Sequence, residues 1–207
     1  MITRRLAVLV LLPALAAGCS GGSSHPGPDV AASAPVPGVT LPPDALTDLV
    51  PRPDEVPAGM VPVLAGSGPR SLQVVASYSG TGAAAQTAAL KLRAHGFQRA
   101  YVAQYANPGT GQVLSVLAST FGTAAGAAAD FGDDLKGGSG TVVPEPTLGE
   151  ASAVTLQKVP GSVVRELVLV RFRRGTTTWS LAYEAAPTAD PALAVDLAKR
   201  LLARSAT

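Results

Sequence analysis

The sequence predicts an α+β fold in which three helices pack against a single, mostly antiparallel sheet of about six strands. Three observations point to this class. Runs of apolar, aromatic and β-branched residues bounded by turn formers predict strands. The short, turn-rich links between several of them favour antiparallel neighbours. Three further segments carry apolar residues at helical spacing, which predicts helices that cover the sheet.

The N-terminal part of the folded region contains a turn, a strand and a helix. Asp44 is a suitable cap for a short helical turn that ends near Val50. We expect a strand over Leu72–Tyr78 and a helix over Ala83–His95, where alanine and leucine residues recur at helical spacing. Gly96 follows directly, as expected of a glycine that ends a helix.

A hairpin and a second helix come next. Strands are predicted over Phe97–Ala106 and Val113–Phe121, joined by residues 107–111, which are rich in turn formers. Thr123 then caps a helix that reaches Lys136.

The C-terminal part is predicted as three strands and a helix. The strands cover Ala151–Lys158, Val163–Arg173 and Thr177–Ala185, and the last two form a hairpin. The dipeptide Asp190-Pro191 begins a final helix that runs to Arg204.

The resulting element order is β-α-β-β-α-β-β-β-α. Within it, the βαββαβ order from Leu72 to Lys158 also satisfies an alternative architecture, a ferredoxin-like core with an added hairpin and helix. We place the folded domain at residues 42–207.

Residues 19–41 are predicted to form a disordered tether. The segment is rich in Ser, Gly, Pro and Ala and has very few large apolar side chains. Such a composition buries too little surface to offset the entropy of ordering.

The first 18 residues have the composition of an export signal. Arg4 and Arg5 precede the apolar run Leu6–Ala17, which is too short for a membrane-spanning helix. With Ala16-Ala17-Gly18-Cys19 at its end, the segment resembles a bacterial lipoprotein signal peptide with its lipobox. The resemblance implies cleavage between Gly18 and Cys19, a lipid on the Cys19 sulfur, and a protein anchored to the extracytoplasmic face of the cell membrane. Sec-type export is our expectation, and a twin-arginine signal is the alternative.

The charge balance argues against nucleic acid as a partner. The chain has 16 basic and 14 acidic residues, and removal of Arg4 and Arg5 leaves 14 of each. A nucleic-acid-binding protein would instead carry a basic patch or stripe.

Motifs for cofactors and catalysis are weak. Gly80-Thr81-Gly82 opens a helix in the manner of a dinucleotide-binding turn, but no acidic residue lies between Glu55 and Asp130 to hold a ribose. We therefore expect no cofactor, no metal and no enzymatic activity. The alternative is a hydrolase-type enzyme with a deep pocket lined by two or more residues of one set. That set is His95, Asp130, Asp133, Glu150, Glu166 and Glu184.

Two groups of side chains are candidates for binding. Tyr101 and Tyr105, with Arg99, share one face of the first hairpin strand, and Arg165, Arg171 and Arg173 share one face of a later strand. Tyrosine and arginine are enriched at binding interfaces. The competing interpretations are that the tyrosines simply rim the sheet and that the arginines are solvated residues which protect a strand edge.

The domain also resembles small extracytoplasmic α+β lipoproteins of actinobacterial type. The resemblance rests on the segment 53–59, the Gly96-Phe97 junction and the closing helix. The signal, the tether and the lack of catalytic motifs favour a lipid-anchored envelope protein that binds a small ligand or an envelope protein without catalysis. A third hypothesis is that the hairpin arginines bind anionic lipid or an envelope polymer.

Overall fold

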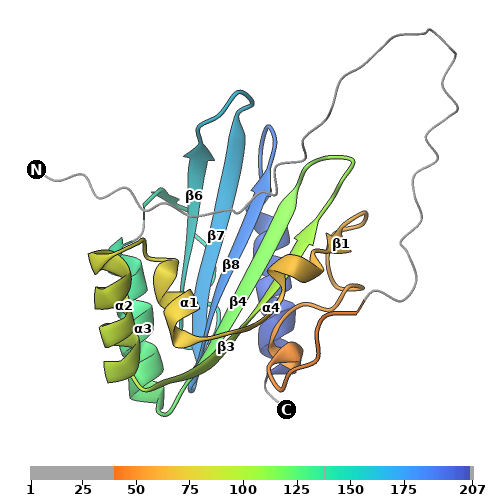
Figure 1. Cartoon of the computed structure of the whole chain (residues 1–207). Helices are drawn as coiled ribbons and strands as arrows, with labels where there is room; N and C mark the ends of the chain where they lie inside the picture. Colours follow the sequence, from red (N-terminus) through yellow and green to blue (C-terminus); the bar gives the residue numbers. More distant parts are fainter. Residues whose placement is uncertain (1–39, 138, 206–207) are drawn as a thin grey trace, which may run out of the picture.

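An antiparallel sheet lies between helices α1, α2 and α3 on one side and helix α4 on the other (Figure 1). The computed structural model describes residues 40–137 and 139–205. The predicted signal peptide, the Gly18–Cys19 cleavage site, the lipidated Cys19 and most of the predicted tether lie outside these residues. Leu41, the last residue of that tether, is buried in the core, so the folded region includes it.

The described chain contains these elements in order. They are η1 (Thr47–Leu49), β1 (Val61–Pro62), η2 (Leu64–Gly66), β2 (Gly68–Arg70), α1 (Leu72–Ser77), α2 (Ala83–Ala94), β3 (Phe97–Ala106), β4 (Val113–Phe121), α3 (Ala124–Gly137), β5 (Thr141–Val142), β6 (Ala151–Val159), β7 (Arg165–Arg174), β8 (Thr177–Ala185) and α4 (Pro191–Arg204).

The eight strands form one sheet in the order β1-β3-β4-β8-β7-β6-β5, and β2 also pairs with β3. Every named pair of strands is antiparallel. The predicted α+β class with one antiparallel sheet is therefore confirmed. The sheet has more strands than expected because β1, β2 and β5 were not predicted.

One predicted strand is wrong. Residues Leu72–Ser77 form helix α1, and the Ser71 hydroxyl caps it by accepting a hydrogen bond from the Val74 amide. The β-branched pair Val74-Val75 favoured a strand, but α1 packs its buried Ala76 into a cluster with α2, α3 and β4. The ferredoxin-like alternative needed a strand here and is also wrong.

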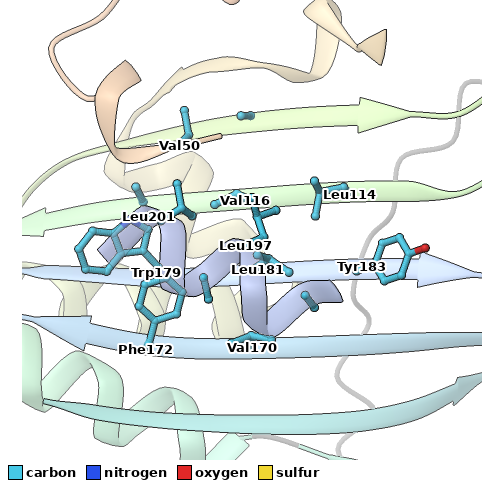
Figure 2. Close-up of a cluster of buried hydrophobic side chains, with 14 of the residues drawn as sticks. Val50, Leu114, Val116, Val170, Phe172, Trp179, Leu181, Tyr183, Leu197 and Leu201 are labelled. Carbon is cyan, nitrogen blue, oxygen red and sulfur yellow. The ribbon is translucent and has the colours of Figure 1, made fainter. Parts of the chain in front are cut away.

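Side chains of the long strands alternate between two faces of the sheet. We call them the α4 face and the α3 face, after the helix that packs on each. The α4 face is apolar, and its buried residues meet Leu197 and Leu201 of α4 (Figure 2). Phe172 and Trp179 stack there with centroids 5.0 Å apart. Burial of one such large side chain contributes about 1.5–3 kcal/mol.

The segment before β1 is held against this same core by hydrogen bonds and an ion pair. The Tyr101 hydroxyl donates to the Pro42 carbonyl at 2.6 Å, and the Trp179 indole N–H donates to the Leu49 carbonyl at 2.8 Å. Arg204 of α4 binds both Glu55 and the Val50 carbonyl. These bonds satisfy polar groups that burial would otherwise leave unpaired.

None of the helices in the described part of the chain is long and apolar enough to cross a membrane.

Candidate functional site

The α3 face differs from the α4 face in polarity. Among the described residues, the buried polar and charged residues of the long strands all lie on the α3 face. They are Ser119, Thr155, Arg171, Thr178 and Glu184. A polar interior needs hydrogen-bond partners, so this face is where a functional site is best sought.

Part of the α3 face is open. We call the half-buried residues of β4 and β8 on this face the open strip: Val113, Ser115, Leu117, Ser180 and Ala182. Their neighbours in sequence on the α4 face, such as Val116 and Leu181, are completely buried. In Figure 1 the ends of the strands near the β6–β7 turn extend beyond α1, α2 and α3. The open strip is thus a solvent-accessible floor of small and apolar side chains.

Helix α3 lies on this face and packs closely against the end of α2. Thr123 caps α3 as predicted, accepting a hydrogen bond from the Gly126 amide at 3.0 Å. A Cβ at Gly126 would lie 1.9 Å from the His95 carbonyl oxygen, so only glycine allows the contact. Ala127 and Phe131 of α3 are buried beneath it.

Arg171 lies in the interior between α3 and the sheet. Its side chain is 8% exposed, and its register partners on the neighbouring strands are Ser180 and Ala153. The Nε atom is buried without a hydrogen-bond partner. The nearest carboxylate is that of Asp134, 3.6 Å from Nε, and the Asp134 side chain is 59% exposed.

Thr155 on β6 is a second polar residue without a partner. Its hydroxyl oxygen is buried and forms no hydrogen bond within the described structure. Ala153 pairs with Arg171, so Thr155 is two positions along β6 on the same face. Diagonal neighbours of this kind have Cα atoms about 7–8 Å apart. No sequence signal pointed to Thr155.

A cluster of ionisable groups joins α2 to α3. His95 lies 3.9 Å from both Asp130 and Asp133, and Lys91 pairs with Asp133 at 3.0 Å. Burial, aided by the charges of Asp134 and Asp133, raises the pKa of Asp130 to about 7. Hydrogen bonds from Lys91 and Lys136 lower the pKa of Asp133.

This cluster has neither the ligand set of a metal centre nor a deep pocket. Within the described ranges, no group of three or more His, Cys, Asp or Glu side chains is arranged to hold a metal ion. Of two open depressions in the surface, one is lined by His95 and the other by Glu166. Neither brings together two members of the predicted acid–base set.

The tyrosines proposed for binding lie in the core. Tyr101 and Tyr105 are fully buried on the α4 face, and the Tyr105 hydroxyl donates to the Pro51 carbonyl at 2.5 Å. Burial raises the pKa of Tyr101. Arg99 is exposed at the start of β3. These three residues therefore do not meet in one exposed site, and their role in binding stays a prediction.

The three hairpin arginines have different surroundings on the α3 face. Arg165 binds Glu184 at 2.7 Å and the Gly111 carbonyl at 2.7 Å, and Arg173 pairs with Glu150. The Gly175 amide and Arg173 both hold the pKa of Glu150 below its usual value. Two of the three charges are thus neutralised by hydrogen-bonded carboxylates, whereas Arg171 has no hydrogen-bonded carboxylate.

Comparisons with known proteins give one informative likeness. No protein-family model matches the chain, and no curated protein matches it. Among solved structures, it is similar to the crystal structure of the extracellular domain of PknH from Mycobacterium tuberculosis, with a TM-score of 0.53 and 12% sequence identity. The match covers 75% of this chain and 92% of that chain. At this identity the similarity concerns the fold.

Proposed function

We propose that this chain is a lipid-anchored protein of the extracytoplasmic cell envelope whose α+β domain binds a ligand, without catalysis, on the α3 face. The observation that carries the proposal is a pair of buried polar atoms without hydrogen bonds on this face. Arg171 Nε lies on β7 opposite Ser180 of the open strip, and Thr155 Oγ1 lies one strand further away on β6. A bound ligand would supply the hydrogen bonds that both atoms lack.

The location is supported by the N-terminus and by the fold. The run from Arg4 to Cys19 has the charge, apolar length and small-residue exit of a lipoprotein signal. The resemblance in fold to an extracellular domain agrees with export. A lipid on Cys19 would hold the domain at the membrane through the predicted tether.

Binding is favoured over catalysis by the positions of the ionisable side chains. Glu150 and Glu184 are each engaged by an arginine. Glu166 accepts a hydrogen bond from the Ala189 amide on the α4 side. The His95–Asp130–Asp133 cluster joins α2 to α3 and does not include any of these glutamates. A general base must lie within hydrogen-bond reach of the group that it deprotonates, and these carboxylates face no common cavity.

The anchor is tested by fractionation of cells that produce the Cys19→Ala variant. We expect the wild type in the membrane fraction with its signal removed, and the variant unprocessed or released. A processed variant that remains in the membrane fraction refutes the lipid anchor.

The α3 face is tested by filling the open strip. Protein purified from its own membranes is examined by native mass spectrometry for a co-purifying small molecule. Ala182→Trp places an indole on the strip, and Ala203→Trp, at an exposed position on α4, is the matched control. Loss of the bound mass in Ala182→Trp alone supports the proposal. Equal retention in both variants places the ligand elsewhere and contradicts it.

A further inference from the structure

We infer that the ligand of the α3 face is a monocarboxylate with an apolar body, its carboxylate bound by Arg171 and Thr155 and its body lying along the open strip. This inference rests on the function proposed above and names the class of ligand.

The protein compensates the positive charge of Arg171 only in part. A buried guanidinium without hydrogen bonds is costly, and a single exposed carboxylate at 3.6 Å compensates it incompletely. Arginine Nε and one terminal nitrogen together match the two oxygens of a carboxylate. A ligand carboxylate at this point would give the guanidinium the hydrogen bonds that Asp134 does not supply.

Two hydroxyls flank Arg171 on the same face of the sheet. Thr155 lies diagonally from Arg171 on β6 and has a hydroxyl without a hydrogen bond, and Ser180 lies opposite Arg171 on β8. A carboxylate between Arg171 and Thr155 would accept hydrogen bonds from both, whereas Ser180 lies on the other side of Arg171. A hydroxyl bound to an ionised oxygen forms a stronger hydrogen bond than one between neutral groups.

The charged groups of α3 limit the charge of the ligand. Helix α3 carries Asp134 beside Arg171 and also Asp130 and Asp133, and the basic groups beside the latter two are Lys91, Lys136 and His95. Both lysines pair with Asp133. The field of the remaining carboxylates penalises each extra negative charge on a ligand, so a carboxylate is favoured over a phosphate dianion.

The open strip limits the length of the apolar body. Between Ser180 and Glu184, the residue that bounds the strip, β8 advances four residues, or about 13 Å at about 3.3 Å per residue. This is the length of about ten carbon atoms in an extended chain. Leu117, Val113 and Ala182 provide apolar contacts along it. The Arg165–Glu184 ion pair closes the far end and disfavours a longer chain.

The test is isothermal titration calorimetry on the full chain carrying Cys19→Ala, so that no lipid is attached. The probes are decanoate, 1-decanol, acetate and inorganic phosphate, with the amphiphiles below the concentration at which they aggregate. We expect decanoate to bind at least tenfold more tightly than 1-decanol and far more tightly than acetate or phosphate. Affinity should rise from butanoate to decanoate and then level off.

Variants assign the interaction to its residues. Arg171→Gln should weaken decanoate binding at least tenfold and leave 1-decanol unchanged, and Thr155→Val should weaken decanoate several-fold. Arg200→Gln, an exposed arginine on α4, is the matched control and should change nothing. Thermal unfolding of each variant confirms that it is folded, and Thr155→Val serves as the test if Arg171→Gln is not.

Three results overturn the inference: no binding of decanoate, binding as weak as that of 1-decanol, or tighter binding of phosphate. None of these affects the Ala182→Trp experiment, because a co-purifying ligand of another chemistry would still be lost there.

Discussion

The close packing of α3 against the end of α2 depends on Gly126. A substitution at this glycine tests that packing directly. In the interior of a helix, Gly→Ala normally stabilises by about 1 kcal/mol. At Gly126 the new Cβ would lie 1.9 Å from the His95 carbonyl oxygen and 3.0 Å from its carbon, both backbone atoms. Relief to an ordinary van der Waals contact of about 3.4 Å requires α3 or the end of α2 to move by about 1.5 Å. Overpacking of this kind costs about 1–3 kcal/mol, occasionally more.

We therefore expect Gly126→Ala to lower the free energy of unfolding by about 2 kcal/mol, which corresponds to a fall of about 4–8 °C in Tm for a domain of this size. Gly132→Ala is the matched control, because it lies in the same helix with nothing within 4 Å of the new Cβ. It should stabilise the protein by up to about 1 kcal/mol. The assay is chemical denaturation followed by circular dichroism. A Gly126→Ala variant as stable as the wild type would refute the packing described for α3.

Two further predictions concern stability. Burial raises the pKa of Asp130 to about 7, above its ordinary value of 3.8, so the stabilisation from its proton is complete below pH 4 and is lost as the pH rises to 7. Asp130→Asn should thus be more stable than the wild type at pH 8 by about 2–4 kcal/mol and similar to it near pH 3.5, and equal stability at pH 8 contradicts the buried carboxylate. Trp179→Phe removes the 2.8 Å hydrogen bond to the Leu49 carbonyl and should cost about 1–3 kcal/mol. Amide hydrogen exchange over residues 41–60 should accelerate in that variant. Unchanged protection of these amides would show that the indole hydrogen bond does not stabilise the segment.

The long strands were predictable because turn formers bound runs that are rich in apolar, aromatic and β-branched residues. Residues 97–106 and 113–121 are joined by one such turn and residues 177–185 follow another, so both the strands and the hairpins followed. Strands β1, β2 and β5 are two or three residues long, too short for such a run to be visible. Helix α1 was missed because two adjacent valines outweighed the cap at Ser71.

The candidate site was predictable only in part. The sequence placed Arg165, Arg171 and Arg173 on one face, which the register confirms. It did not distinguish Arg171 from the other two, because the partners Glu184 and Glu150 come from remote segments and the burial comes from α3. Thr155 had no signal, since an alternating strand permits a threonine on either face. The burial of Tyr101 and Tyr105 was not predicted, because the carbonyls of Pro42 and Pro51 that accept from their hydroxyls come from a remote segment.

The central claim is that the Arg171 guanidinium, whose Nε is buried without a hydrogen bond, binds an external carboxylate. Its Nε–H resonance in a ¹⁵N-labelled full chain carrying Cys19→Ala, assigned by its absence in Arg171→Gln, reports this directly. On titration with decanoate the proton resonance should move downfield and saturate, as expected for a new charge-assisted hydrogen bond, and 1-decanol should leave it unchanged. A resonance that does not respond to decanoate, or that responds equally to both probes, contradicts the account.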